Sequence, residues 1–374
     1  MELTLRGLIN SDIVFGFMLT KRKDVTYMKR REFFGLGALA GAGLLAGGAK
    51  AVAKSGGASV PGQVKFCVFA DIHYKPGVWG FPNSTKEWLG QILDRAKREK
   101  CDFVIHCGDM CHNPPEVKDY IDYYNDFELP TYHTLGNHET DGCSYEDVLK
   151  TFRIEKGNYF FDRNGFRFIV VDTNYFYRKS IKGFVHFGKG VKQDGDAWGR
   201  IPDEQYEWIE RTIDESPFPC VTFSHLSFER AVGNIRMRDI FAKANAKTPG
   251  KVRMSINGHY HCDYLRMLDN VLYFDVNSAS YQWIGSKRAH KHYPVEFFQR
   301  QGMGDRARKV PWIAYNDPLC AIVTMTADGG VKIEGAESSF ACGVTPKKVG
   351  MEVDYHSRAT TPRIQSANMK IVYG

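Results

Sequence analysis

Several features that define particular protein classes are missing from this chain of 374 residues. It has no Cys-x-x-Cys pair and no internal repeat, and an odd number of cysteines, nine, argues against a dense disulfide framework. The apolar stretch over residues 33–49 is shorter than the ~20 residues that span a bilayer comfortably. With 43% hydrophobic and 25% charged residues, the chain is typical of a globular protein, which excludes a disordered or fibrous one.

The charge is too small to indicate a dedicated nucleic-acid binder. The formal net charge is +7, and the segment before Lys54 contributes eight Lys and Arg against four Asp and Glu, which leaves +3 for the rest. Nucleic-acid binders usually carry a stronger or more clustered basic excess. We therefore expect no specific nucleic-acid partner, although a mild positive charge can steer anionic substrates.

Residues 1–53 resemble a twin-arginine signal peptide with an atypical N-terminal extension. Lys29-Arg30-Arg31 leads into a Gly/Ala/Leu-rich stretch, and Ala51-Val-Ala53 offers the small residues that a signal peptidase reads. The resemblance implies export of a folded, metal-loaded protein by the twin-arginine machinery to the periplasm or the outside, with no stable membrane span once processed. An uncleaved signal that anchors the protein in the membrane is the alternative. Translation from Met28 would give a more conventional signal.

Residues 54–63 read as a linker, and beyond it apolar runs alternate with amphipathic ones, as expected for strands and helices in layers. We expect one domain over 64–345 and a C-terminal extension over 346–374. The dipeptide Asn164-Gly165 predicts a type I′ hairpin. The other expected strands and hairpins lie at 64–70, 102–107, 131–135, 220–223, 252–256, 264–277 and 321–334. Helices are expected at 84–99, 116–127, 144–152 and 202–214. Ser84-Thr-Lys-Glu87 predicts a capping box at the start of the first helix, and Ser144 is the expected N-cap of the third.

Two stretches of the domain are expected as insert loops. Residues 173–200 are rich in glycine, lysine and aromatics, and residues 281–317 interleave aromatics with cations. The second loop can either clamp an organic phosphate or form an exposed, solvated loop. Its conspicuous side chains are Trp283, Lys287, Arg288, His290, Lys291, His292, Tyr293 and Phe297.

Five short polar motifs each follow an apolar run, at the carboxyl ends of strands where α/β sheets place their ligand crevice. They are Asp71-Ile-His73, Gly108-Asp109, Gly136-Asn137-His138-Glu139, Ser224-His225 and Gly258-His259-Tyr260-His261. Residues at i and i+2 of an extended segment point the same way, so each Asp-x-His or His-x-His pair could close on one ion. The glycines permit close approach of the backbone. Together the motifs supply two carboxylates, one amide and up to five imidazoles, which suits two first-row metal ions.

The order of these motifs resembles the calcineurin-like metallophosphoesterase superfamily, which includes purple acid phosphatases, protein phosphatases and class III cyclic-nucleotide phosphodiesterases. The resemblance covers about residues 64–280. It implies an α/β (α+β) fold, a four-layer αββα sandwich of two mixed β-sheets flanked by helices. It also implies that Asp109 bridges two metals, with His138 facing the leaving group. The implied ligands of the first metal are Asp71, His73 and His261, and those of the second are Asn137, His225 and His259.

The chain departs from the family pattern beside the bridging aspartate. Many members carry an acidic residue three positions after it, whereas this chain has His112. A tyrosine there is the purple-acid-phosphatase ligand, so no purple colour is expected. We predict substrate-binding roles for His112, Asn113, Tyr260 and Trp283. The cysteines near the motifs, Cys107, Cys111, Cys143 and Cys262, are most simply small buried residues, with a thiolate ligand or a local disulfide as the alternative.

The expected activity is hydrolysis of a small phosphomonoester or phosphodiester by in-line attack of metal-bound hydroxide. The cofactors are two divalent or mixed-valent ions, and the ligand types suit iron, manganese and zinc alike. A phosphodiesterase acting on cyclic nucleotides or on nucleotide or lipid diphosphates is an alternative, and a non-catalytic metal-binding scaffold is a third hypothesis. The sequence does not name the substrate or the oligomeric state.

Overall fold

The computed structural model describes residues 62–75, 82–188, 198–230 and 234–372. The predicted signal peptide and most of the predicted linker lie outside these residues. Among the helices that are described, none is long and apolar enough to cross a membrane.

The first sheet has six strands in the order β19-β16-β15-β1-β2-β3. Strand β1 lies inside the sheet, parallel to β2 and antiparallel to β15, so the sheet is mixed. Parallel pairing continues from β2 to β3. The strand bounds are β1 Gln63–Phe69, β2 Phe103–Cys107, β3 Thr131–Thr134, β15 Ala321–Thr326, β16 Gly330–Glu334 and β19 Ala367–Lys370.

The second sheet also has six strands, in the order β11-β12-β10-β9-β5-β4. Its four inner strands are parallel, and an antiparallel hairpin closes each edge. Asn164 and Gly165 both have positive φ, 49° and 80°, as the predicted type I′ turn requires. The bounds are β4 Tyr159–Arg163, β5 Phe166–Val171, β9 Cys220–Ser224, β10 Val252–Asn257, β11 Tyr264–Leu268 and β12 Val271–Asp275.

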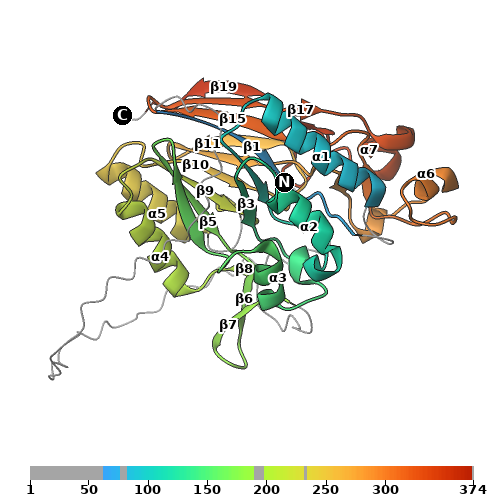
Figure 1. Ribbon diagram of the computed structural model, residues 1–374, viewed down its shortest axis with the longest axis horizontal. Helices are drawn as coiled ribbons and strands as arrows, with labels where there is room; N and C mark the ends of the chain where they lie inside the picture. Colours follow the sequence, from blue (N-terminus) through green and yellow to red (C-terminus); the bar gives the residue numbers. More distant parts are fainter. Residues whose placement is uncertain (1–61, 76–81, 189–197, 231–233, 373–374) are drawn as a thin grey trace, which may run out of the picture. The chain divides into compact units, whose positions relative to one another are not determined.

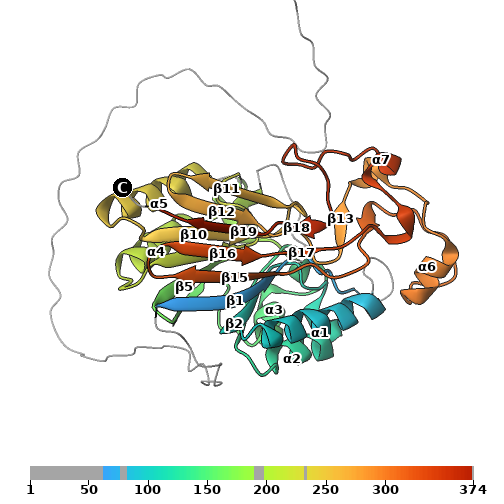
Figure 2. The same ribbon diagram turned by 90° about the horizontal axis from the view of Figure 1, so that it is seen from above.

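The two sheets pack face to face, and helices cover their outer faces (Figures 1 and 2). Apolar side chains from β1, β2, β5, β9, β10, β12, β15 and β16 form the core between the sheets. Helices α1 (Pro82–Arg98), α2 (Lys118–Asn125) and α3 (Tyr145–Phe152) pack on the first sheet. Helices α4 (Asp203–Asp214) and α5 (Asn234–Lys247) cover the second. The predicted αββα sandwich is confirmed.

The helix boundaries correct three details of the sequence analysis. Helix α1 begins at Pro82, so Ser84 lies inside the helix and not at its N-cap. The helix expected over 116–127 is a 3₁₀ turn, η1 (Pro114–Val117), followed by α2. Helix α5 was not predicted. The expected cap of α3 is present, because Ser144 and Asp147 form a capping box.

The stretch 173–200 is not an irregular loop, because three short strands form a small sheet there. They are β6 (Tyr175–Arg178), β7 (Gly183–His186) and β8 (Trp198–Arg200). Nε2 of His186 donates a hydrogen bond of 2.9 Å to the buried Oδ2 of Asp172, just after β5. All the aromatic residues of this stretch except Phe187 therefore belong to these strands, and the hydrogen bond from His186 connects β7 to the rest of the protein.

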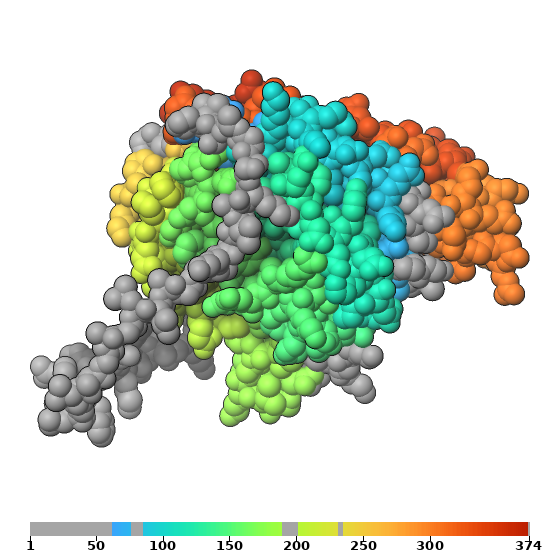
Figure 3. All heavy atoms as spheres, viewed as in Figure 1, coloured from blue at the N-terminus to red at the C-terminus, as the bar shows by residue number. Residues whose placement is uncertain are grey.

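The stretch 281–317 is likewise ordered, with β13 (Tyr281–Trp283), η3 (Ser286–Arg288), α6 (Val295–Arg300) and β14 (Trp312–Ala314). It shares a separate apolar core with residues 340–351, which contain η4 (Ala341–Gly343) and α7 (Pro346–Val349). We call residues 281–314 and 340–351 the insert lobe, which projects at the right of Figure 3. Tyr293 and Phe297 are buried in its core, so they do not clamp a ligand.

Of the predicted C-terminal extension over 346–374, the described residues 346–372 pack with the rest of the domain. Strand β19 is the edge strand of the first sheet, and β18 (Arg363–Ile364) pairs with β17 (Ala336–Glu337). His356 is buried between α7 and β18, and its Nε2 lies 2.7 Å from the buried Oδ2 of Asp275. The His356 ring also stacks on Tyr264.

Replacement of His356 by alanine is expected to lower the free energy of unfolding by about 2 kcal/mol, because the buried carboxyl of Asp275 is left without its nearest polar partner. Burial raises the pKa of the Asp275 carboxyl, and His356 opposes that rise. Urea unfolding measures the loss. His292→Ala, at an exposed histidine, is the control. Equal stability of the two variants would show that this contact contributes nothing.

Candidate metal centre

The five motifs converge from both sheets onto one edge of the sandwich. Asp71 and His73 follow β1, Asp109 follows β2, and Asn137 with His138 follows β3. From the second sheet, His225 follows β9, and His259 and His261 follow β10. These five strands run parallel within their sheets, so their carboxyl ends share the edge where α/β folds bind ligands.

The local geometry differs from the extended one that the sequence predicted. Five ligand candidates have left-handed backbone conformations, which non-glycine residues rarely adopt. Such conformations cost about 1–3 kcal/mol each and persist where the surrounding structure imposes them. The side chains of these paired ligands are therefore oriented by the left-handed backbone, and not by the alternation of side chains along an extended strand. The φ angles are 52° at Asp71, 55° at His73, 51° at Asp109, 72° at His259 and 51° at His261.

The first cluster of donor atoms comes from Asp71, His73 and His261, all of them buried. Nε2 of His73 lies 3.1 Å from Nε2 of His261 and 3.8 Å from Oδ1 of Asp71. Oδ1 of Asp71 lies 3.5 Å from Nε2 of His261. Three donors this close can bind one ion.

The second cluster surrounds His225, whose Nε2 lies 3.2 Å from each of three other donors. These are Oδ2 of Asp109, Oδ1 of Asn137 and Nδ1 of His259. Oδ2 of Asp109 is also 3.9 Å from Nε2 of His73 in the first cluster. Asp109 therefore lies between the two clusters.

Backbone carbonyls orient two of the imidazole rings. Nδ1 of His225 donates to the carbonyl oxygen of Cys107 and Nδ1 of His261 donates to that of Tyr281, both at 2.8 Å. In the neutral rings, Nε2 then carries the lone pair that faces the clusters, which is the usual arrangement around a metal-binding histidine. Burial lowers the pKa of His225, but Asp109 outweighs it and raises the pKa to about 10. A bound cation would have to displace that proton.

The donor set fits two divalent cations. Oδ1 of Asp71 is buried and accepts no hydrogen bond from the described residues. An unpartnered buried carboxylate oxygen is costly, and a cation in the first cluster would satisfy it. Carboxylate, amide and imidazole are ligands of iron, manganese and zinc.

Three glycines make room for this crowding, as the sequence predicted. A Cβ on Gly108 would collide with the His225 ring, and one on Gly136 with Asp109. A Cβ on Gly258 would lie 2.7 Å from both Oδ2 of Asp71 and the carbonyl oxygen of Cys107.

Gly258→Ala is therefore expected to displace Asp71 and to weaken metal binding at least about 10-fold, the scale on which displaced ligand partners act. Titration of the metal-free protein with Mn²⁺ measures the effect. Gly183→Ala is the matched control, because the nearest atom to its Cβ would be 3.7 Å away. If both variants bind Mn²⁺ like the parent, the close approach at Gly258 does not matter.

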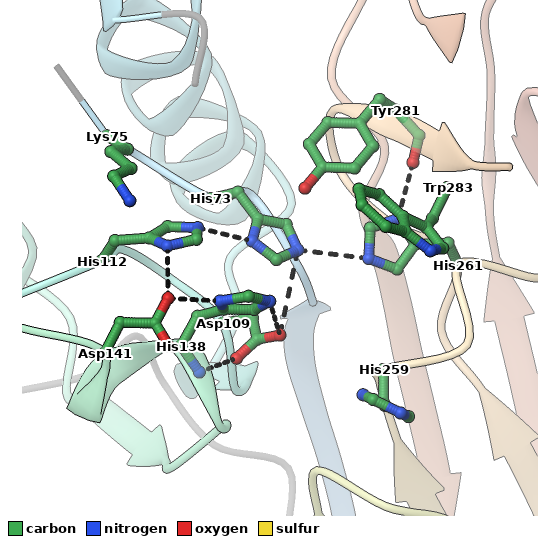
Figure 4. A pocket seen from close by; sticks show the side chains of 10 residues that line it. All are labelled: His73, Lys75, Asp109, His112, His138, Asp141, His259, His261, Tyr281 and Trp283. Carbon is green, nitrogen blue, oxygen red and sulfur yellow. Dashed lines mark hydrogen bonds and ion pairs between the residues drawn. The ribbon is translucent and has the colours of Figure 1, made fainter. Parts of the chain in front are cut away.

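Members of both clusters, His73 and His261 from the first and Asp109 and His259 from the second, line a cavity of ≈ 360 Å³ (Figure 4). Two of the predicted substrate-binding residues, His112 and Trp283, line it. Asn113 lines a neighbouring cavity that shares Lys75, His112 and Asp141 with the first. Tyr260 lines neither of them, and its ring packs on His259 and His356. The lining residues are His73, Lys75, Asp109, His112, His138, Asp141, His259, His261, Tyr281 and Trp283.

Two carboxylic side chains next to His138, those of Glu139 and Asp141, also make contacts within the site, and no role for either was predicted from the sequence. The buried carboxylate of Glu139 accepts backbone N–H bonds from Met110 at 2.6 Å and Gly136 at 2.8 Å, which ties two motif loops together. Burial and the nearby Asp109 raise the pKa of Glu139 to about 8. Oδ2 of Asp141 accepts a 2.6 Å hydrogen bond from Nδ1 of His138. The i, i+3 spacing of His138 and Asp141 could have indicated this pair.

Two opposing effects determine the ionisation of His138. Loss of hydration lowers its pKa, but Asp109 and the hydrogen-bonded Asp141 outweigh that loss and raise it. Burial would raise the pKa of Asp141, yet hydrogen bonds from His112 and His138 hold it well below its usual range. Nε2 of His138 lies 4.0 Å from Oδ2 of Asp109 and is therefore placed at the metal clusters.

Residues 64–263 match the calcineurin-like phosphoesterase family, so the chain belongs to this family. It is a hydrolytic, metal-dependent phosphoesterase. A dimetal phosphatase from Danio rerio is similar at 14% identity and a TM-score of 0.48, over 74% of this chain and 98% of that one. GAP50, the anchor in the inner membrane complex of Plasmodium, is similar at 11% identity and a TM-score of 0.45, over 83% and 89%. No curated protein matches the chain.

Proposed function

We propose that this phosphoesterase binds two divalent ions and hydrolyses small phosphomonoesters or phosphodiesters. The observation that carries the proposal is that two donor clusters share Asp109 inside one cavity that also contains His138. Asp71, His73 and His261 would hold one ion, Asn137, His225 and His259 the other, and Asp109 both. Ions bound there supply positive charge for the phosphoryl group and a nucleophilic water.

The side chains around the clusters define what the protein itself contributes. Nε2 of His138 faces Asp109 and can donate a proton to the departing oxygen, while Asp141 holds the opposite ring nitrogen. The Tyr281 ring stacks on His73 and fixes one wall of the cavity, and Lys75 adds a cation. These groups orient a phosphate ester between a basic wall and an aromatic one.

The insert lobe favours a second candidate, a phosphodiesterase acting on cyclic nucleotides or on nucleotide or lipid diphosphates. The lobe contains nine Lys and Arg but only two Asp and Glu, so its formal net charge is +7, the same as that of the entire chain. Arg288 donates a hydrogen bond to the carbonyl oxygen of Gly350, and Lys348 donates one to that of Gly343. A carbonyl oxygen carries no full negative charge, so these two hydrogen bonds do not neutralise the cations. The lobe also contributes Trp283 to the cavity, and an aromatic side chain beside cations suits an organic phosphate.

Metal analysis of the purified protein combined with a substrate panel tests both candidates. The panel contains p-nitrophenyl phosphate, bis-p-nitrophenyl phosphate, cyclic AMP and a dinucleoside diphosphate. We expect two ions of iron, manganese or zinc per chain and turnover that is lost with a chelator. Preference for the nucleotides would favour the second candidate. Absence of turnover for every ester in the metal-loaded protein would overturn the proposal.

We further propose export by the twin-arginine route, as the N-terminal motif Lys29-Arg30-Arg31 indicates. N-terminal sequencing of the mature protein should begin after Ala53. Arg30→Lys with Arg31→Lys should retain the full-length precursor inside the cell. Processing of that variant at the parental rate would argue against the route, and an uncleaved product in the membrane fraction would support an anchor.

A further inference from the structure

One carboxylate oxygen receives hydrogen bonds from two imidazole rings beside the metal clusters (Figure 4). Oδ2 of Asp141 lies 2.6 Å from Nδ1 of His138 and 2.9 Å from Nδ1 of His112. The other nitrogen of His112, Nε2, lies 3.1 Å from Nδ1 of His73. The side chain of His112 is 7% exposed, whereas that of Asp141 is 32% exposed at the cavity wall.

The partners determine where the protons lie along this chain. A carboxylate can only accept, so Nδ1 of both His112 and His138 must carry a proton. Nε2 of a neutral His112 then has a free lone pair, which accepts the Nδ1 proton of His73. The lone pair on Nε2 of His73 is left facing Asp71 and His261. With the protons placed in this way, the hydrogen bonds from Asp141 to His112 and from His112 to His73 each have one donor and one acceptor.

We propose that Asp141 and His112 are positioning residues that couple the two halves of the site. Asp141 holds His138 toward the leaving group, and through His112 it also holds His73 toward the first metal. The His138 half of this inference rests on the proposed function, whereas the His73 half concerns metal binding alone.

The fold explains why this chain needs both residues. His112 follows β2, and its imidazole cannot supply a negative charge. Asp141 follows η2 (His138–Thr140) in the next motif loop and supplies that charge from the other side. Charge-assisted hydrogen bonds of this kind are about twice as strong as neutral ones. Outer partners of a metal-binding histidine typically change metal affinity 10–100-fold.

The first test measures metal affinity and needs no substrate. Titration of the metal-free protein with Mn²⁺ should show about 10-fold weaker binding by His112→Ala. His112→Gln keeps an acceptor for His73 and should bind Mn²⁺ more tightly than His112→Ala. Asp119→Asn, at an exposed position on α2, is the control. Equal Mn²⁺ affinity of His112→Ala and the parent would overturn the coupling to His73.

The second test measures kcat for a series of aryl phosphates with leaving groups of increasing pKa. Asp141→Asn should slow the poorest leaving groups about 10-fold more than the best, since a misplaced acid matters most there. His112→Ala should leave this dependence unchanged. A uniform loss across the series for Asp141→Asn would overturn the positioning of His138. If the parent hydrolyses no ester at all, the proposed function fails, while the Mn²⁺ titration still decides the role of His112.

Discussion

Asp109→Ala is expected to abolish turnover, with a loss of at least about 10³-fold in kcat/KM. The carboxylate lies between the two donor clusters, with Oδ2 3.9 Å from Nε2 of His73 and 3.2 Å from Nε2 of His225, and it is 3% exposed. Loss of several kcal/mol of charge stabilisation in the transition state corresponds to a factor of this size. Metal content should fall as well, because Oδ2 of Asp109 serves both clusters.

Two further variants separate the charge of Asp109 from its packing. Oδ1 of Asp109 accepts the backbone N–H of His138 at 2.9 Å, so alanine also frees that loop. Asp109→Asn keeps an acceptor of the same shape and should still lose metal and activity. Asp119→Ala is the surface control and should behave like the parent. Unchanged kcat/KM in Asp109→Asn would disprove the bridging role.

His138→Ala is expected to lower kcat about 10²–10⁴-fold while both metals stay bound, which is the usual contribution of a general acid. His138 is no member of either donor cluster that contains Asp71 or Asp109, and its side chain is 35% exposed at the cavity. The loss should grow as the leaving group becomes a stronger base, because such oxygens need the proton most.

Metal analysis and kinetics on a series of aryl phosphates measure this effect. His292→Ala, at an exposed histidine of the insert lobe, is the matched control. A His138→Ala protein that loses its metals would show instead that this ring is required to assemble the site. An equal slowing of good and poor leaving groups would argue against proton donation.

Much of the layered fold could be predicted because its signals are local. Apolar runs of strand length, the Asn164-Gly165 turn and the Ser144 cap each act within a few residues. Helix α5 carried such a signal and was missed, since Met237, Ile240, Phe241 and Ala244 are buried at helical spacing. The insert lobe was read as a loop because its core depends on residues 340–351, which are distant in sequence.

In the candidate site too, features with a local sequence signal could be predicted, and features that depend on residues distant in the sequence could not. The motifs identified ligand types and strand ends, but the left-handed backbone at Asp71 and His73 is imposed by packing between strands. The role of Asp141 depends on its contact with His112 in another loop, a contact that no spacing shows. His356 was likewise invisible, because its partner Asp275 lies about eighty residues earlier.

The placement of the donor residues would make an ion in either cluster a cross-link between the two sheets. Asp71 and His73 come from the first sheet and His261 from the second, and the other cluster is divided in the same way between Asn137 and His225. An ion in either cluster would be held by residues from both sheets. Metal loading would then report that the sandwich has closed, and chelation should loosen the packing between the sheets before it affects either sheet by itself.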